Sequence, residues 1–85
     1  MSGRLKFDRV ETFYLGPGAI GGTTLPLGLS EHEGICVLSG VGGRFAGYGD
    51  SVEVWVSEGG WVISLNCGES GTEITAKATV FRYED

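Results

Sequence analysis

The sequence has 85 residues, with eleven acidic and six basic side chains and a net charge of −5. This length suits one domain, residues 1–85, and an acidic chain without a basic cluster is poorly suited to binding nucleic acid. No apolar run approaches the roughly 18 residues of a membrane span, so we expect no membrane insertion. The N-terminal MSGRLKFDRVE lacks the apolar core of a signal peptide, and the start at Met1 indicates a separate gene product.

Residues 4–15, RLKFDRVETFYL, predict strand structure with an irregularity near the middle. Apolar and polar residues alternate from Leu5 to Phe7, and the alternation changes phase near Asp8 and Arg9. A β-bulge inserts one extra residue into a strand and shifts the alternation in this way. We therefore expect one bulged strand or two short strands.

The stretch LGPGAIGG contains the spacing G-x-G-x-x-G at Gly16, Gly18 and Gly21. In a dinucleotide-binding fold this motif follows a strand, and a helix begins at the last glycine. The next residues, GGTTLPLGL, include Pro26 and Gly28 and do not favour a helix, and no acidic residue stands about 20 positions further on. The stretch is therefore interpreted as a loop, and no nucleotide cofactor is expected.

The motif EHE places His32 between Glu31 and Glu33, with Cys36 four residues beyond the histidine. A zinc site needs three or four ligands, and only Cys67 could complete this one. Side chains of adjacent residues on an extended chain point to opposite faces. We interpret the motif as an exposed polar loop before a strand, with no metal bound. With a single histidine and no G-x-S-x-G motif, the chain is expected to have no enzymatic activity.

The middle of the chain, GICVLSGVGGRFAGYGD, begins with a strand-like run from Ile35 to Ser39. Gly40, Gly42 and Gly43 then interrupt the run, and a bulge or a sharp bend is expected there. The residues AGYGD that follow are interpreted as a loop.

Residues 51–67 predict a β-hairpin. Two segments with strict alternation flank SEGG, which supplies the glycines that a hairpin turn requires. A turn at this position pairs residues in a register that brings the large apolar side chains onto one face, namely Val56 with Trp61, Val54 with Ile63, and Val52 with Leu65. The same face continues to Cys67.

The C-terminal residues TEITAKATVFRYED alternate again and are rich in β-branched and aromatic residues, which favour a strand. One face carries Ile74, Ala76, Ala78 and Val80, and the other carries Thr75, Lys77, Thr79, Phe81 and Tyr83. With 16 glycines and no sustained helical periodicity, the whole chain predicts an all-β fold of five to seven short strands joined by glycine-rich loops. The expected architecture is a small antiparallel β-sandwich or a jelly-roll-like barrel.

Cys36 and Cys67 allow at most one disulfide, and two buried free thiols are the alternative. Three aromatic side chains are the candidates for a functional surface. Trp55, Phe81 and Tyr83 lie on strand faces opposite the expected core. Large aromatic side chains on an outer face indicate an interface or a binding surface. The alternative is that a second layer or a subunit contact buries them.

Residues 35–81 carry motifs with a recognisable order: CVL, GRFAGYGDSVEVWV, GGWVISL and ITAKATVF. In this order they resemble a small β module of bacteriophage tail-fibre and virion surface proteins and of variable pilin tips. The resemblance implies a non-enzymatic β module displayed on the surface of a particle. In that family a second cysteine follows the closing Ala-x-Ala, whereas Val80 stands here, so the resemblance implies no crosslink. The resemblance does not identify any residue of this chain that contacts a ligand.

The expected function is that of a bacteriophage virion structural protein, a surface decoration, spike or fibre component that acts through protein–protein assembly. Ordering the glycine-rich segments 16–22 and 40–49 costs more backbone entropy than ordering other sequence. Neighbouring copies in a homo-oligomer, with a trimer expected first, or other virion proteins would hold them. The alternative function is a carbohydrate- or receptor-binding lectin-like adhesion module that recognises a host-surface glycan.

Overall fold

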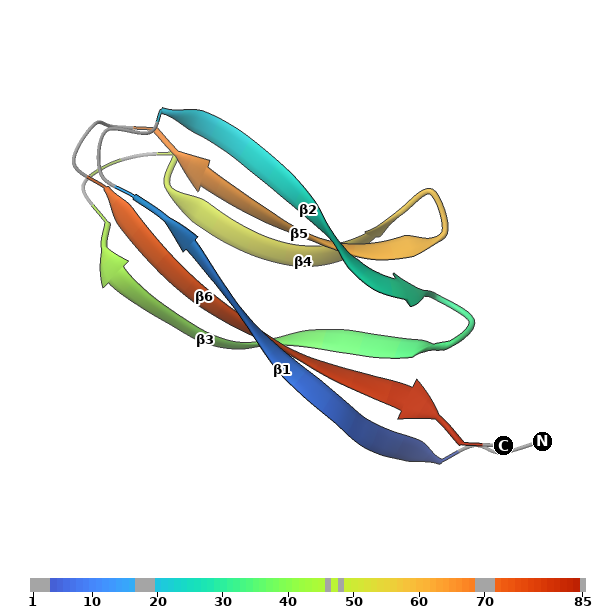
Figure 1. The fold of residues 1–85 in the computed structure, drawn as a ribbon. Coiled ribbons are helices and arrows are strands. Elements are labelled where there is room, and N and C mark those ends of the chain that lie inside the picture. The colour runs from blue at the N-terminus through green and yellow to red at the C-terminus, as the bar shows by residue number, and fades with distance from the viewer. Residues whose placement is uncertain (1–3, 17–19, 46, 48, 69–71, 85) are drawn as a thin grey trace.

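The computed structural model describes residues 4–16, 20–45, 47, 49–68 and 72–84. Within these ranges the chain forms six antiparallel strands in two three-stranded sheets, packed face to face as a small sandwich, and no helix (Figure 1). The all-β class and the sandwich are therefore confirmed. The strands are β1 (Leu5–Leu15), β2 (Gly21–Ser30), β3 (Gly34–Arg44), β4 (Ser51–Ser57), β5 (Gly60–Cys67) and β6 (Glu73–Tyr83).

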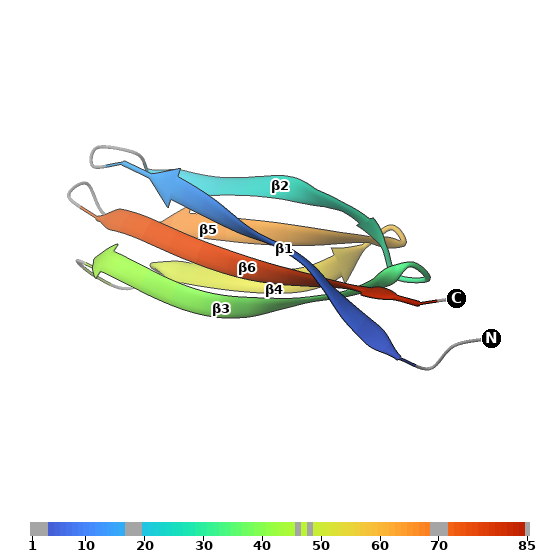
Figure 2. The same cartoon turned by 60° about the horizontal axis from the view of Figure 1, so that its bottom comes forward.

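The two sheets each have a central strand from the C-terminal half of the chain. Sheet A has the order β1-β6-β3, and sheet B has the order β2-β5-β4. Successive strands cross from one sheet to the other except at the β4–β5 hairpin, which stays in sheet B. Figure 2 shows the two layers from the side of sheet A, with β1 twisting across β6. Since the first strand pairs with the last, sheet A is complete only when β6 is in place.

The β4–β5 hairpin has the predicted register. Val56 pairs with Trp61, Val54 with Ile63, and Val52 with Leu65. The turn consists of Glu58 and Gly59, whose φ angles of 51° and 80° are both positive, as a two-residue type I′ turn requires. This turn matches the right-handed twist of the two strands, so the local sequence is sufficient to set the pairing.

Two strands of sheet A contain bulges. In β1 the register with β6 shifts between Phe7 and Arg9, so the N-terminal segment is a single bulged strand, one of the two predicted alternatives. In β3 it shifts between Leu38 and Gly40, and the strand then continues to Arg44. The expected bulge is therefore present at Gly40, but the strand does not end there. Pairing with β6 supports the backbone there.

Gly43 shows why glycine occurs in this part of β3. Its φ of 107° lies in the left-handed region, and a Cβ at this position would overlap the carbonyl oxygen of Glu73 on β6. The expected loop of residues 46–50 follows the strand, although positions 46 and 48 lie outside the described residues. Glycine in this segment therefore permits close approach of two strands as well as turning.

The segment GGTTLPLGLS forms β2, a strand that the sequence analysis did not assign. It is an edge strand, so Pro26, which lacks an N–H donor, is tolerated in it. The register with β5 shifts between Pro26 and Ser30, and Gly28 has a φ of 70° within this irregular part. The predicted loop at LGPGAIGG is correspondingly shorter, because Gly21 and Gly22 belong to the strand. Residues 17–19 of that loop lie outside the described ranges.

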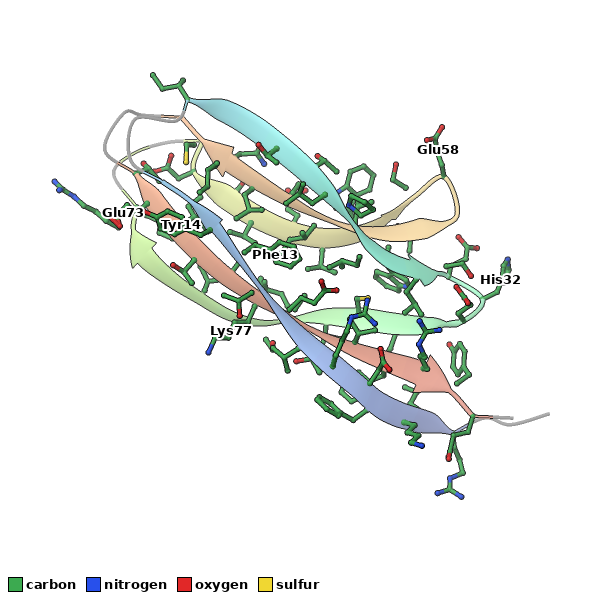
Figure 3. The ribbon with its side chains drawn as sticks, in the orientation of Figure 1. Phe13, Tyr14, His32, Glu58, Glu73 and Lys77 are labelled. Carbon is green, nitrogen blue, oxygen red and sulfur yellow. The ribbon has the colours of Figure 1, made fainter. Side chains whose placement is uncertain are left out.

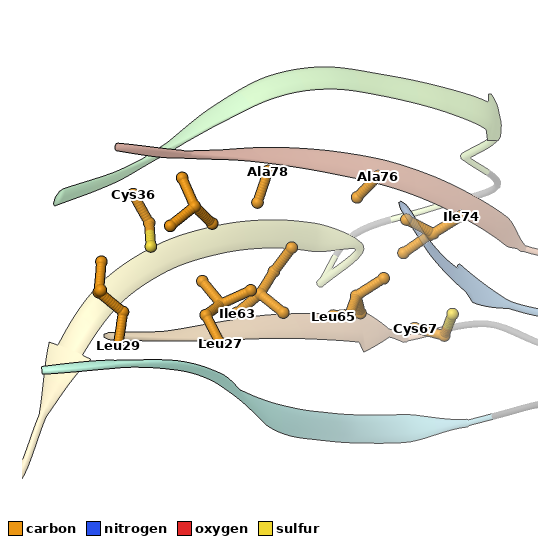
Figure 4. Close-up of a cluster of buried hydrophobic side chains, with 10 residues drawn as sticks. Leu27, Leu29, Cys36, Ile63, Leu65, Cys67, Ile74, Ala76 and Ala78 are labelled. Atoms are coloured by element: carbon orange, nitrogen blue, oxygen red, sulfur yellow. The ribbon is translucent and has the colours of Figure 1, made fainter. Parts of the chain in front are cut away.

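The core lies between the sheets, where ten apolar side chains are buried. The inward face of β6 matches the prediction, and its short Ala76 and Ala78 leave room for Ile63 and Leu65 of β5 (Figure 4). Phe13 and Trp61 pack against this cluster from the sides. The buried set is Leu27, Leu29, Cys36, Ile63, Leu65, Cys67, Ile74, Ala76, Ala78 and Val80.

Polar interactions hold the sheets together at one side and one end of the core. The Arg9 guanidinium on β1 donates to the carbonyl oxygen of Leu27 on β2 at 2.6 Å and so joins the two sheets. At the loop end, the Asp50 carboxylate accepts hydrogen bonds from the backbone of Gly68 and from the Thr72 hydroxyl, both at 2.8 Å. The start of β4 is thereby linked to the end of β5 and to the start of β6.

Truncation of Ile63 tests the position of the core. Ile63 is fully buried, so Ile63→Ala should lower the free energy of unfolding by about 2–5 kcal/mol. Ile20→Ala removes the same atoms from a side chain that is 70% exposed and should cost less than about 0.5 kcal/mol. Urea denaturation of the two variants measures both values. Equal losses would contradict the assignment of the inner face.

Candidate interaction surfaces

Apolar side chains cover one half of the outer face of sheet A. Two rungs of the sheet place Phe7, Phe81 and Ile35 side by side, and then Val10 and Val37 on either side of a threonine. We call this group, together with the neighbouring pair of Leu5 and Tyr83, the apolar patch. Its seven members are Leu5, Phe7, Val10, Ile35, Val37, Phe81 and Tyr83.

The apolar patch is well exposed and has an ordered centre. Phe7 is 58% exposed, and its ring meets that of Phe81 edge to face with the centroids 6.3 Å apart. The patch exposes on the order of 500 Å² of apolar surface, a size that is often functional in a soluble protein. No described element packs over this face. The hypothesis that Phe81 and Tyr83 point away from the core agrees with this placement.

Charged residues of both signs lie at the terminal end of sheet A, where Arg82 projects from the face opposite Phe81 and Tyr83. The Arg82 guanidinium lies 3.6 Å from an oxygen of Asp8 and 3.6 Å from an oxygen of Glu33. Arg4 and Glu84 form a further exposed ion pair at 3.4 Å. Because these pairs are open to solvent, they contribute little to stability but present a mixed charge pattern to any partner.

The EHE motif forms the turn between β2 and β3. His32 points away from the body of the protein (Figure 3), and Glu33 accepts a hydrogen bond from the backbone N–H of Ser30 at 2.9 Å. This bond lowers the pKa of the Glu33 carboxyl, and the nearby Arg82 acts in the same direction. Cys36 is buried in the core and away from the turn surface. The motif is thus a hydrogen-bonded polar turn.

Trp55 lies on the outer face of sheet B, on the opposite side of the sandwich from Phe81 and Tyr83. Its indole N–H donates to the Ser64 hydroxyl at 2.9 Å, and Ser64 also shares a hydrogen bond with Thr24 at 2.9 Å. The three aromatic side chains singled out in the sequence therefore belong to two separate surfaces.

Several members of the apolar patch were not identified from the sequence. Phe7 and Val10 lie on either side of the bulge in β1, so strict alternation assigns them to opposite faces. The bulge restores them to the same face. The change in apolar and polar alternation near Asp8 indicated the bulge. It could not assign Phe7 and Val10 to one face without the knowledge that β1 pairs with β6. Ile35 and Val37 likewise required the pairing of β3 with β6.

The two cysteines are free thiols in the core. Cys36 and Cys67 lie towards opposite ends of the buried cluster (Figure 4), so of the two alternatives the structure has the buried thiols and not the disulfide. Burial raises the pKa of both thiols, because the interior disfavours a thiolate. In the described part of the chain, no three His, Cys, Asp or Glu side chains form a group that could hold a metal ion.

No family model, curated protein or solved structure matches this chain. Among the described residues, no helix is long and apolar enough to cross a bilayer.

Thiol labelling tests the burial of the cysteines. In the folded protein, Cys36 and Cys67 should both react with Ellman's reagent at least about tenfold more slowly than in the chain unfolded in guanidinium chloride, because neither is accessible or readily ionised. Two equivalents should react after unfolding. Rapid reaction of either thiol in the native protein would contradict its placement in the core.

Proposed function

We propose that this protein is a non-enzymatic structural component of a bacteriophage virion that assembles through the apolar patch of sheet A. The observation that carries the proposal is an exposed apolar surface, with Phe81 at its centre and the exposed Phe7 beside it, on a three-stranded face that no described element covers. The area is suited to the apolar centre of an interface that buries about 800 Å² on each partner.

The proposed partner is another copy of the same chain. All six basic residues lie on the strands of sheet A or next to β1, so this side is the least acidic part of a chain with a net charge of −5. The strands of sheet A also carry Asp8, Glu11 and Glu73, so this side presents charges of both signs to a second copy. Residues of both signs at the rim, including Arg82 and Glu33, can form complementary pairs between copies.

The assignment to a virion is supported by the resemblance of residues 35–81 to the phage surface module. This range runs from β3 into β6 and so contributes strands to both sheets. A structural role agrees with the surroundings of the reactive side chains, since His32 is on an exposed turn and both thiols are in the core. The proposed place of action is the virion surface, where the protein would serve as a decoration, spike or fibre component beside other virion proteins.

Substitution of Phe7 tests the assembly surface. Phe7→Ala removes the most exposed ring of the apolar patch and should weaken self-association by at least about tenfold, as the loss of a large aromatic contact does. Sedimentation velocity over a concentration series measures the association constant and gives the number of copies, for which a trimer is expected.

Tyr14→Ala provides the matched control for this experiment. Tyr14 is 62% exposed and lies on the same strand, but it is outside the apolar patch. Its removal should change the association constant by less than about twofold. A wild-type chain that stays monomeric at about 100 µM, or equal effects of the two substitutions, would contradict assembly through this surface.

A further inference from the structure

Trp55 lies on the outer face of sheet B and is held there by a hydrogen bond. It pairs with Val62, whereas its indole N–H reaches Ser64, two residues further along β5. Ser64 is only 6% exposed although it occupies an outward position, and Trp55 is 43% exposed. The edge of the indole therefore contacts Ser64, while much of the ring stays exposed to solvent. The hydrogen bond fixes the ring in this orientation.

Neutral hydrogen-bonding groups surround the exposed indole. Thr24 shares the Ser64 hydroxyl, and the Asn66 carboxamide donates to the Ser51 hydroxyl at 3.0 Å. Asn66 lies over Gly22 of the neighbouring strand, where any side chain would collide with it. Their backbone positions are about 5 Å apart between strands and about 7 Å apart along a strand.

The charge of sheet B restricts the ligand further. Its three strands contain no basic residue, and Glu53 is their only charged residue. Glu53 is on the outer face beside Trp55, where its carboxylate can accept hydrogen bonds from hydroxyl groups but repels anions. An acidic polysaccharide or a phosphate is therefore disfavoured, and a neutral polyhydroxylated ligand fits.

We propose that the outer face of sheet B is a binding site for neutral sugars, in which a pyranose ring stacks on Trp55. The C–H groups of one sugar face would pack on the indole, while Glu53, Thr24 and Asn66 bond to the hydroxyl groups at its edge. This site is on the opposite side of the sandwich from the apolar patch. It does not depend on the assembly proposed above, and sugar could be bound by a single copy or by an oligomer.

Nuclear magnetic resonance of the indole N–H groups tests the proposal directly. The chain has two tryptophans, so the two indole signals can be assigned with the Trp55→Phe variant. The probes are hexasaccharides of glucose, galactose and N-acetylglucosamine, with a hexamer of galacturonic acid as the acidic comparison. At least one neutral probe should shift the Trp55 signal with saturation, and the acidic hexamer should bind at least about tenfold more weakly.

Two substitutions distinguish the contribution of the Trp55 ring to sugar affinity from that of the hydrogen bond that orients the ring. Trp55→Ala should reduce the affinity for the neutral probe at least about tenfold. Ser64→Ala keeps the ring but frees it from the sheet, and should reduce the affinity several-fold while moving the Trp55 indole signal even without sugar. Tyr14→Ala removes an exposed aromatic side chain from the other sheet and should leave sugar binding unchanged.

Three results would overturn the proposal. The first is that none of the neutral hexasaccharides shifts the Trp55 signal, and the second is that Trp55→Ala binds sugar as well as the wild type. The third is that only a peptide rich in arginine or lysine shifts the signal. This last outcome would identify the face as a cation–π site for a protein partner, with Glu53 as the counter-charge. Self-association measured by sedimentation is a separate readout, so failure of the sugar site would leave the assembly proposal intact.

Discussion

The packing of β5 against β6 is the interaction on which the rest of the structure depends. These two strands occupy the centres of their sheets and supply seven of the ten buried apolar side chains. Ala76 and Ala78 on one strand face the larger Ile63 and Leu65 on the other, so the sheets can approach closely (Figure 4). Every other strand is an edge that pairs with one of these two. Loss of this contact would remove the partner of all four edges at once.

The same packing determines what the two outer faces can carry. Once alternate residues of β5 and β6 point inward, the residues between them must point outward, and the outer faces then differ in chemistry. Sheet A presents Phe81 together with apolar neighbours and most of the charge, whereas sheet B presents one tryptophan together with Ser64 and Asn66. A single chain of this length therefore offers two surfaces with distinct binding properties on opposite sides.

The sequence was most informative where structure is local. The hairpin register followed from the turn at Glu58 and Gly59, and the inner face of β6 followed from strict alternation. β2 was missed because Pro26 and Gly28 normally indicate a loop, and only its edge position makes them acceptable. The apolar patch required the pairing of β1 with β6. Their partners are about 70 residues apart, and neither periodicity nor propensity specifies such a pairing.

The meeting of β1 and β6 also affects how the domain can be attached to a larger structure. The backbone N–H of Glu84 donates to the carbonyl of Arg4 at 3.0 Å, so the chain enters and leaves the sandwich at one point. A host protein could carry this domain within a surface loop without stretching it, because both linkers would leave from the same end. The starts of β4 and β6 lie at the far end of the long axis (Figure 1). In such a fusion they would form the tip, with the two outer faces exposed along the shaft.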